Sequence, residues 1–377
     1  MEKQSFEELE LNELLLKGVY LHGFTNPSPI QIKGIESINT QKDCLLQSQS
    51  GTGKTATYLL GVLNRLEVND KIQAIIIVPT RELLNQVYTE AVILSKFTGL
   101  TIELCVGGTN IMETKNKLKK ANLIIGTIGR LYHMINDKVI NCNNLKLFVM
   151  DEADEFLKDG VDEKLMFIIN KLPTNIQSVL ISATINNSIY SLGLLKDPIK
   201  ILLKNYEVVV DLISQFYIDV ESEEYKFDTL LDLYNLLSTS QVIIFCNKIS
   251  TIDSLKENLE KNNFPITSIH SKMTQEERNL IVQEFRDGKT RILLTTDLLS
   301  RGIDIPQVNL VVNYDLPLDK DTYIHRIGRC GRFGKRGVAV SMYKSLVALD
   351  NRILQKMRQF YKIDIQPMPN DISKFLN

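Results

Sequence analysis

The chain has 377 residues, of which 44% are hydrophobic, and its 44 Lys and Arg side chains nearly balance 45 Asp and Glu side chains. This composition is that of a globular protein, and the neutral balance excludes the broad basic surface of a nucleic-acid coat protein while permitting a local basic groove. The five cysteines form no C-x-x-C pair, which argues against a disulfide framework and a zinc site. No apolar run approaches the ~20 residues of a membrane span. We therefore expect a protein of a reducing intracellular compartment with no membrane partner.

Short apolar runs rich in Val and Ile recur between helical patterns. The first series is CLLQ from residue 44, AIIIVP from 74, IELCV from 102, LIIGT from 123, LFVMD from 147 and VLISAT from 179. The second series is QFYIDV from 215, VIIFCN from 242, ITSIH from 266, RILLTTD from 291, LVVNYD from 310 and VAVSMY from 338. Strands that are apolar throughout indicate a parallel sheet covered by helices on both faces. The sequence therefore predicts the α/β class, with two similar units in tandem.

The two series also suggest where the chain divides. A chain of this length exceeds what one hydrophobic core usually supports. The charged, irregular stretch LLKNYEVVVDL, from 202 to 212, separates the two strand series. We expect an N-terminal domain over residues 1–203, a linker over 204–212 and a C-terminal domain over 213–377.

The stretch SQSGTGKT, residues 48–55, follows the first predicted strand and precedes a helical pattern. That is the context of a phosphate-binding loop, for which a plain turn is the alternative. Gly51 and Gly53 let backbone N–H groups turn toward phosphate oxygens at a helix N-terminus. Lys54 would reach the β- and γ-phosphates, and the Thr55 hydroxyl would ligate Mg²⁺. The predicted loop is completed by Ser48, which stands where the usual pattern has glycine, and by Gln49, Ser50 and Thr52.

The run LFVMDEADEFL ends a predicted buried strand in carboxylates. Apolar strands rarely finish in several acidic residues without a cation to hold, although a solvated strand end is the alternative. Asp151 would anchor Mg²⁺, often through water, and Glu152 would orient and deprotonate the attacking water.

With DEAD at residues 151–154 and SAT at 182–184, the sequence resembles the DEAD-box RNA helicase family. The resemblance spans almost the whole chain and implies two RecA-like domains, ATP and Mg²⁺ as cofactors, and RNA held across both domains by its backbone. The segment GFTNPSPIQ, residues 23–31, resembles the adenine-reading segment of the family. Phe24 would pack on the base and Gln31 would hydrogen-bond its edge, because an amide matches the adenine N7 and its exocyclic amine. A proline-rich turn with a structural glutamine is the alternative.

Other stretches resemble the RNA-binding motifs of the family. Residue types such as glycine, hydroxyl side chains and arginine suit RNA phosphates and ribose hydroxyls. The residues so implied in the first domain are Pro79, Thr80 and Arg81 in PTREL, Gly107 and Gly108 in VGG, and Thr127, Gly129 and Arg130 in TIGR. Those in the second domain are Asn247 in FCN, Gln275 and Arg278 in QEER, and Thr296 in TTD.

The stretch HRIGRCGR, residues 325–332, resembles the last motif of the family, in which arginines of the second domain complete the ATP site on the first. Arg329 and Arg332 would contact the γ-phosphate, and Arg326 would brace the carboxylate cluster. A guanidinium suits this role because it is always charged and presents a planar fork. A basic surface loop is the alternative. Gly302 and Asp304, from RGID, are expected at the nucleotide, with Asp304 on the ribose.

Within the family, several stretches look most like the eukaryotic translation initiation factor 4A group, which includes both initiation factors and an exon-junction clamp. The resemblance implies a monomer in the cytoplasm or the nucleus, with a translation-initiation scaffold or another helicase-stimulating protein as a partner. A double-stranded DNA translocase and a clamp that hydrolyses little ATP are the alternative functions. Among the departures from the family pattern, Ile128 replaces the usual proline, which is expected to loosen a turn.

Overall fold

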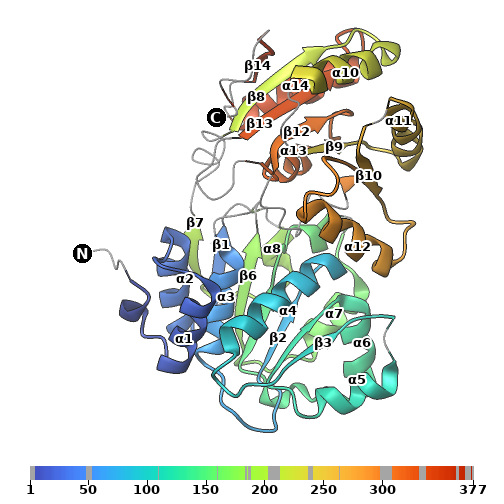
Figure 1. The fold of residues 1–377 in the computed structure, drawn as a ribbon. Coiled ribbons are helices and arrows are strands. Elements are labelled where there is room, and N and C mark those ends of the chain that lie inside the picture. Colours follow the sequence, from blue (N-terminus) through green and yellow to red (C-terminus); the bar gives the residue numbers. More distant parts are fainter. Residues whose placement is uncertain are drawn as a thin grey trace. The chain divides into compact units, whose positions relative to one another are not determined.

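The structure is a computed structural model that describes residues 5–47, 53–108, 110–158, 160–182, 185, 188–202, 213–236, 241–262, 264–297, 308–330, 337–361, 365–369 and 375. The chain divides into two compact units, Met1–Lys204 and Asn205–Asn377. Figure 1 shows the helices and strands of each unit. None of the helices in the described ranges is both long and apolar enough to span a bilayer.

The first unit is built on a seven-stranded parallel sheet in the order β3-β4-β2-β5-β6-β1-β7. Its strands are β1 (Cys44–Gln47), β2 (Ala74–Ile77), β3 (Ile102–Cys105), β4 (Leu123–Gly126), β5 (Leu147–Met150), β6 (Gln177–Ser182) and β7 (Ile199–Leu202). Its helices are α1 (Glu13–His22), α2 (Pro29–Asn39), α3 (Lys54–Leu63), α4 (Arg81–Ser95), α5 (Ile111–Leu118), α6 (Ile128–Asn136), α7 (Glu163–Asn170) and α8 (Ser188–Ser191). Short 3-10 turns are η1 (Glu7–Leu9), η2 (Cys142–Asn144) and η3 (Glu155–Leu157).

Two apolar cores cover the two faces of this sheet. Successive side chains of a strand point to opposite faces, so Ala74 and Ile76 join one core while Ile75 and Ile77 join the other. Helices α1 to α4 contribute to the first core, and α5 to α8 to the second. Both faces are therefore covered, as the apolar runs predicted.

The second unit repeats this design with a seven-stranded parallel sheet in the order β10-β11-β9-β12-β13-β8-β14. Its strands are β8 (Ile213–Asp219), β9 (Gln241–Phe245), β10 (Ile266–Ile269), β11 (Ile292–Thr295), β12 (Val308–Asn313), β13 (Gly337–Tyr343) and β14 (Gln366–Pro367). Its helices are the 3-10 turn η4 (Glu223–Tyr225), α10 (Lys226–Leu236), α11 (Ile249–Lys261), α12 (Gln275–Arg286), α13 (Lys320–Ile327) and α14 (Ala348–Tyr361). Helices α12, α13 and α14 pack on one face, and α10 and α11 on the other.

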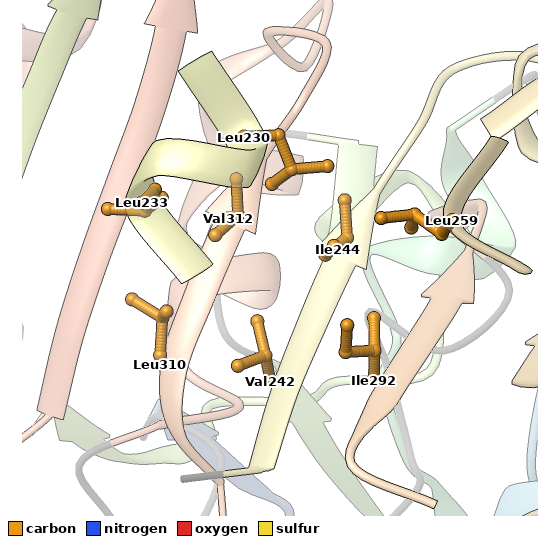
Figure 2. A pocket seen from close by; sticks show the side chains of 8 residues that line it. All are labelled: Leu230, Leu233, Val242, Ile244, Leu259, Ile292, Leu310 and Val312. Carbon is orange, nitrogen blue, oxygen red and sulfur yellow. The ribbon is translucent and has the colours of Figure 1, made fainter. Parts of the chain in front are cut away.

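A pocket lies in the second core of this unit, between the sheet and helices α10 and α11 (Figure 2). Its lining consists of aliphatic side chains: Leu230, Leu233, Val242, Ile244, Leu259, Ile292, Leu310 and Val312. A lining of this kind offers a polar ligand no orienting group, so the pocket is a packing gap of the core.

Candidate functional site

The polar residues of the first unit gather at the edge where the parallel strands end. Strands β1 and β5 both flank β6, so the chain segments that follow them arrive at the same edge. Lys54 begins α3 shortly after β1, and Asp151 comes directly after β5. Ligands of open α/β sheets bind at this carboxyl edge. The structure thus brings the predicted phosphate-binding lysine and the predicted catalytic carboxylates into one neighbourhood.

Asp151 is held in one position by backbone and side-chain donors. Its backbone N–H donates to Ile77 O at 3.0 Å, which ties the turn to β2. Its Oδ1 accepts from the Glu152 N–H at 2.9 Å, and its Oδ2 accepts from the Tyr58 hydroxyl at 2.8 Å. Burial raises the pKa of Asp151 to about 6, and the neighbouring Lys54 ammonium opposes that rise. The carboxylate is therefore buried and oriented.

Lys54 and Glu152 are buried near Asp151, and each has a polar atom that lacks a hydrogen-bond partner in the described ranges. In the described ranges, neither Lys54 Nζ nor Glu152 Oε2 has a hydrogen-bond partner. Only 8% of Lys54 and 5% of Glu152 is exposed, so water cannot replace those partners freely. Glu152 also adopts a left-handed backbone, with φ of 52°. Buried charges without partners and a strained backbone residue are typical of sites that bind a ligand.

Thr55, the other predicted Mg²⁺ ligand, follows Lys54 on α3. Tyr58, one turn after Lys54 on the same helix, carries the hydroxyl that donates to Asp151. Tyr58 was not singled out from the sequence, because a tyrosine in an apolar helical pattern reads as a core residue. The signal was its position four residues after Lys54, which places both on one face of α3. The other predicted loop residues, Ser48, Gln49, Ser50, Gly51 and Thr52, lie outside the described residues.

Gly53 connects the predicted phosphate loop to the predicted adenine-reading segment. It caps α3 in a left-handed conformation, with φ of 93°. A Cβ atom at this position would lie 2.8 Å from the Gln31 Nε2 atom, so a side chain would collide with Gln31. The two segments are therefore in contact, although they are separated in sequence.

Gln31 lies at the start of α2 in a capping box with Ser28. The Ser28 N–H donates to Gln31 Oε1 at 2.7 Å, and the Gln31 N–H donates to Ser28 Oγ at 3.4 Å. Oε1 keeps its second lone pair, and Nε2 remains directed toward Gly53. Phe24 is partly buried, and its ring stacks on His22 with centroids 4.2 Å apart. Gln31 therefore caps helix α2, as expected for a structural glutamine. Its amide also retains a donor and a lone pair that could hydrogen-bond a base.

Three predicted RNA-binding motifs of the first unit meet at another part of the same edge. The Arg81 guanidinium lies over Gly107 and Gly108, 3.3 Å and 3.4 Å from the positions where Cβ atoms would be. Arg130 Nε donates to Val106 O at 3.0 Å, which fixes the same glycine turn from the side of α6. Gly108 has a φ of 85°, a conformation that favours glycine. These contacts produce a cluster of two arginines around an exposed backbone turn.

The remaining predicted residues of this group lie at helix starts. Pro79 and Thr80 follow β2, and Thr80 Oγ1 caps α4 by accepting from the Leu83 N–H at 3.2 Å. Thr127 precedes α6, and nothing lies within 4 Å of a Cβ placed on Gly129. The backbone at Gly129 is therefore open to a ligand.

Ile128 occupies the first helical position of α6, a position that proline often takes. Its side chain packs against the second core of the first unit. The expected loosening of the turn by loss of proline is therefore opposed by apolar packing at the same residue.

In the second unit, Arg326 is fully buried and bonded to its own unit. Its guanidinium donates to Asp297 Oδ1 at 2.6 Å, to Asp315 O at 2.7 Å and to Asn247 Oδ1 at 2.7 Å. It also lies over the Phe245 ring, 5.2 Å from the centroid. These bonds engage Arg326 within its own unit, and its bracing of the carboxylate cluster stays a prediction. Its partners hold three segments of the second unit together.

Asn247 is fixed by the same network. Its N–H donates to Asp315 Oδ2 at 2.9 Å, and its side-chain amide donates to Leu316 O at 2.8 Å. With Oδ1 bonded to Arg326, both ends of the amide have protein partners. The structure therefore places Asn247 as an exposed residue of fixed orientation.

Other predicted residues of the second unit are dispersed or lie outside the described part. Arg329 follows α13, is 2% exposed, and donates from Nε to His325 O at 3.2 Å. Arg278 lies on α12, and Gln275 begins it, although the Gln275 side chain is not among the described ones. Thr296 directly follows β11, and its carbonyl accepts from the Thr295 hydroxyl at 2.9 Å. The residues outside the described ranges are Gly302, Asp304 and Arg332.

Comparisons with known proteins identify the family and the fold of the chain. A family model described as DEAD/DEAH box helicase matches residues 28–192, and one described as helicase conserved C-terminal domain matches residues 225–334. Eukaryotic initiation factor 4A of Caenorhabditis elegans is 41% identical over 377 residues, covering 99% of this chain and 93% of the relative. Eukaryotic initiation factor 4A of Dictyostelium discoideum is 42% identical over 378 residues, with 99% and 93% covered. The solved structure of S. cerevisiae Dbp5 bound to RNA and ADP BeF3 is 36% identical, with a TM-score of 0.89 over 97% of this chain and 95% of that one.

Proposed function

The chain belongs to the DEAD-box family of ATP-dependent RNA helicases, and we propose that the carboxyl edge of its first unit is where ATP is hydrolysed. Lys54 binds the β- and γ-phosphates, and Asp151 and Thr55 hold Mg²⁺. Glu152 orients the attacking water and accepts its proton. The observation that carries these assignments is the pair of buried groups without partners, Lys54 Nζ and Glu152 Oε2, beside the oriented Asp151 carboxylate.

The residues present fit a nucleotide-bound Mg²⁺ ion. Among the described residues, no group of three or more His, Cys, Asp or Glu side chains is arranged to hold a metal by itself. Mg²⁺ needs no such cage, because it keeps several waters and binds one or two carboxylates together with substrate phosphates. When bound, it neutralises charge on the phosphate oxygens. The chain's contribution is an oriented Asp151 oxygen and a Thr55 hydroxyl on the same side of α3.

The nucleotide base is read by the segment beside Gly53. Gln31 contacts Gly53 through its Nε2 atom, so the base-reading amide and the phosphate loop lie next to each other. The Gln31 amide offers a donor and a free lone pair to adenine, and Phe24 packs on the ring. The remaining nucleotide contacts are assigned to the loop residues 48–52 and, from the second unit, to Gly302 and Asp304.

RNA is held by its sugar-phosphate backbone. In the first unit, Arg81 and Arg130 flank the turn at Gly107 and Gly108, so guanidinium charge lies beside a glycine turn that is exposed at Gly108. In the second unit, the contacts come from Gln275, Arg278, Thr296 and the fixed segment at Asn247. Because such contacts carry no base readout, binding is independent of sequence and sensitive to salt.

ATP and RNA each contact both units and therefore favour each other's binding. Arg329 and Arg332 reach the γ-phosphate when both ligands are bound, and hydrolysis removes that contact. The helicase then releases RNA. Short duplexes are separated locally through this cycle, without processive movement along the strand.

The finer role follows the relatives named initiation factor 4A. Their identity of 41–42% over almost the whole chain supports a role in translation initiation, and hence a cytoplasmic location. A scaffold or another helicase-stimulating protein is the expected protein partner.

The test is ATP turnover of the purified chain alone, measured without nucleic acid, with single-stranded RNAs of unrelated sequence and with duplex DNA. We expect every RNA to stimulate turnover and DNA to be ineffective, with a steep loss of RNA affinity as salt rises. Tight ATP-dependent RNA binding with little turnover would instead show a clamp. Stimulation by duplex DNA would show a translocase.

A further inference from the structure

Tyr58 contacts Asp151, one of the two residues that are proposed to hold Mg²⁺. It lies one turn after Lys54 on α3, so its side chain shares the face of the helix that carries the site. Its hydroxyl donates to Asp151 Oδ2 at 2.8 Å. Tyr58 is fully buried, as is the contact with Asp151. The phenol therefore holds a proposed metal ligand from inside the core.

We propose that Tyr58 is a positioning residue for nucleotide-bound Mg²⁺, acting through Asp151; the inference rests on the proposed function of Asp151. The last torsion of an aspartate side chain is broad, and hydrogen bonds to both oxygens restrict it most. Here the Glu152 N–H fixes Oδ1 and the Tyr58 hydroxyl fixes Oδ2. Each oxygen keeps a further lone pair for the metal or its water.

The hydroxyl has no other purpose in the packing of this region. The Tyr58 ring belongs to the first core of the unit, together with its helix neighbours Leu59 and Leu60. A phenylalanine ring would fill the same space, so the core does not require the oxygen atom. A buried hydroxyl is costly without a partner, and the partner of this one is the proposed metal ligand Asp151. Partners of metal ligands typically affect metal affinity 10- to 100-fold when removed.

The experiment measures how strongly Mg²⁺ promotes nucleotide binding. The dissociation constant of N-methylanthraniloyl-ADP is determined for the full chain in Mg²⁺ and in EDTA, and the ratio of the two constants is compared between variants. We expect Tyr58→Phe to reduce this ratio about tenfold, while affinity in EDTA stays close to that of the unmodified protein. Tyr58→Leu is a second variant without the hydroxyl, and because each ratio is taken within one variant, a general loss of affinity cancels.

Tyr323→Phe is the matched control. Tyr323 is also fully buried, and its hydroxyl donates to Gln215 Oε1 at 2.9 Å in the second unit. This variant is expected to lower thermal stability without changing the ratio. If Tyr58→Phe likewise lowers the unfolding temperature and leaves the ratio within twofold, Tyr58 is a core residue only and the proposal is overturned.

Asp151→Asn separates the proposal from the function on which it rests. This variant is expected to lose most of the Mg²⁺ dependence. If it does so while Tyr58→Phe retains the full ratio, the positioning role is wrong and the assignment of Asp151 stands. If Asp151→Asn also retains the full ratio, the Mg²⁺ site itself is misassigned and the role of Tyr58 is lost with it.

Discussion

The sheet of the first unit has a buried carboxylate at each of its two edges, and the two carboxylates differ in whether their oxygens have hydrogen-bond partners. At the amino edge, Asp43 precedes β1, and its Oδ1 and Oδ2 accept from the Ser178 and Lys196 N–H groups, both at 2.7 Å. At the carboxyl edge, Glu152 has a buried oxygen without a partner in the described ranges. Both side chains are nearly inaccessible, with 8% of Asp43 and 5% of Glu152 exposed. Burial alone therefore does not distinguish them.

What distinguishes the two edges is whether the protein completes its own hydrogen bonds. The amino edge is closed further by Gln177, whose Nε2 donates to Ile38 O at 3.0 Å and to Lys42 O at 2.6 Å. At the carboxyl edge, Lys54 Nζ and Glu152 Oε2 lack hydrogen-bond partners in the described ranges, and the Glu152 backbone is left-handed. Folding stabilises the first arrangement by itself, whereas the second gains its missing partners from a ligand.

The largest effect on the chemistry proposed for the carboxyl edge is expected from the arginines of the second unit. We expect Arg332→Ala to leave ATP affinity within a few-fold and to reduce single-turnover ATP cleavage at saturating RNA by ~10³ to 10⁵. The reason is that a guanidinium on the γ-phosphate acts mainly in the transition state. Arg329→Ala should lose as much, and should also destabilise the second unit, because Arg329 is buried and bonded to His325 O.

Lys335→Ala and Arg336→Ala are the controls for this prediction. They remove the same charge just beyond the motif and are expected to change cleavage little, because a surface charge that does not contact the nucleotide would contribute ~1 kcal/mol or less. Equal, modest losses in all four variants would reduce the stretch to a basic surface loop.

A substitution at the amino edge should lower the free energy of unfolding. Asp43→Asn replaces one of two charged acceptors by an NH₂ group that faces a backbone N–H, and we expect a loss of about 2 kcal/mol in the free energy of unfolding. Glu152→Gln removes a charge that has an incomplete set of partners, so it should not destabilise the nucleotide-free protein. Urea unfolding, followed by hydrogen exchange of peptides from β1 and β6, measures the first unit separately. An equal loss in both variants would contradict the distinction between the two edges.

The smallest expected effect concerns the base. Gln31→Ala should reduce the preference for ATP over GTP about tenfold, because guanine presents an acceptor where adenine presents a donor. Ser28→Ala is the matched control: it breaks the capping box from the other side and leaves the Gln31 amide in place. Competition binding with both nucleotides gives the preference. If the control loses as much selectivity, Gln31 acts only as a helix cap.

The sequence patterns predicted every strand of both sheets except β7 and β14, one edge strand of each sheet. Every apolar run that was singled out is a strand, because a strand covered on both faces is apolar throughout. Strand β7 is an edge strand of four residues that is interrupted by Lys200, and β14 has two residues, so neither produces such a run. Patterns of this kind cannot detect a strand whose pairing is decided by tertiary structure.

The site was predictable where its residues follow one another in the chain. Gly53, Lys54 and Thr55 form one motif, as do Asp151 and Glu152, and their spacing indicated phosphate and metal chemistry. The partners of Arg326 and Tyr58 lie far away in sequence, at separations of 79 residues for Asn247 and 93 residues for Asp151. Such pairs are created by the fold, so the sequence alone indicated neither the Asn247 partner of Arg326 nor the Asp151 partner of Tyr58.

The difference between the edges is tested most directly by single-turnover ATP cleavage at saturating RNA, compared between Glu152→Gln and Asp43→Asn. Both variants change one buried carboxylate of the first unit into an amide. If the incomplete edge performs the chemistry, Glu152→Gln should lower the cleavage rate by ~10² to 10⁴, and Asp43→Asn should stay within a few-fold at a temperature where it is folded. Cleavage by Glu152→Gln at the rate of the unmodified protein, or an equal loss in Asp43→Asn, would contradict it.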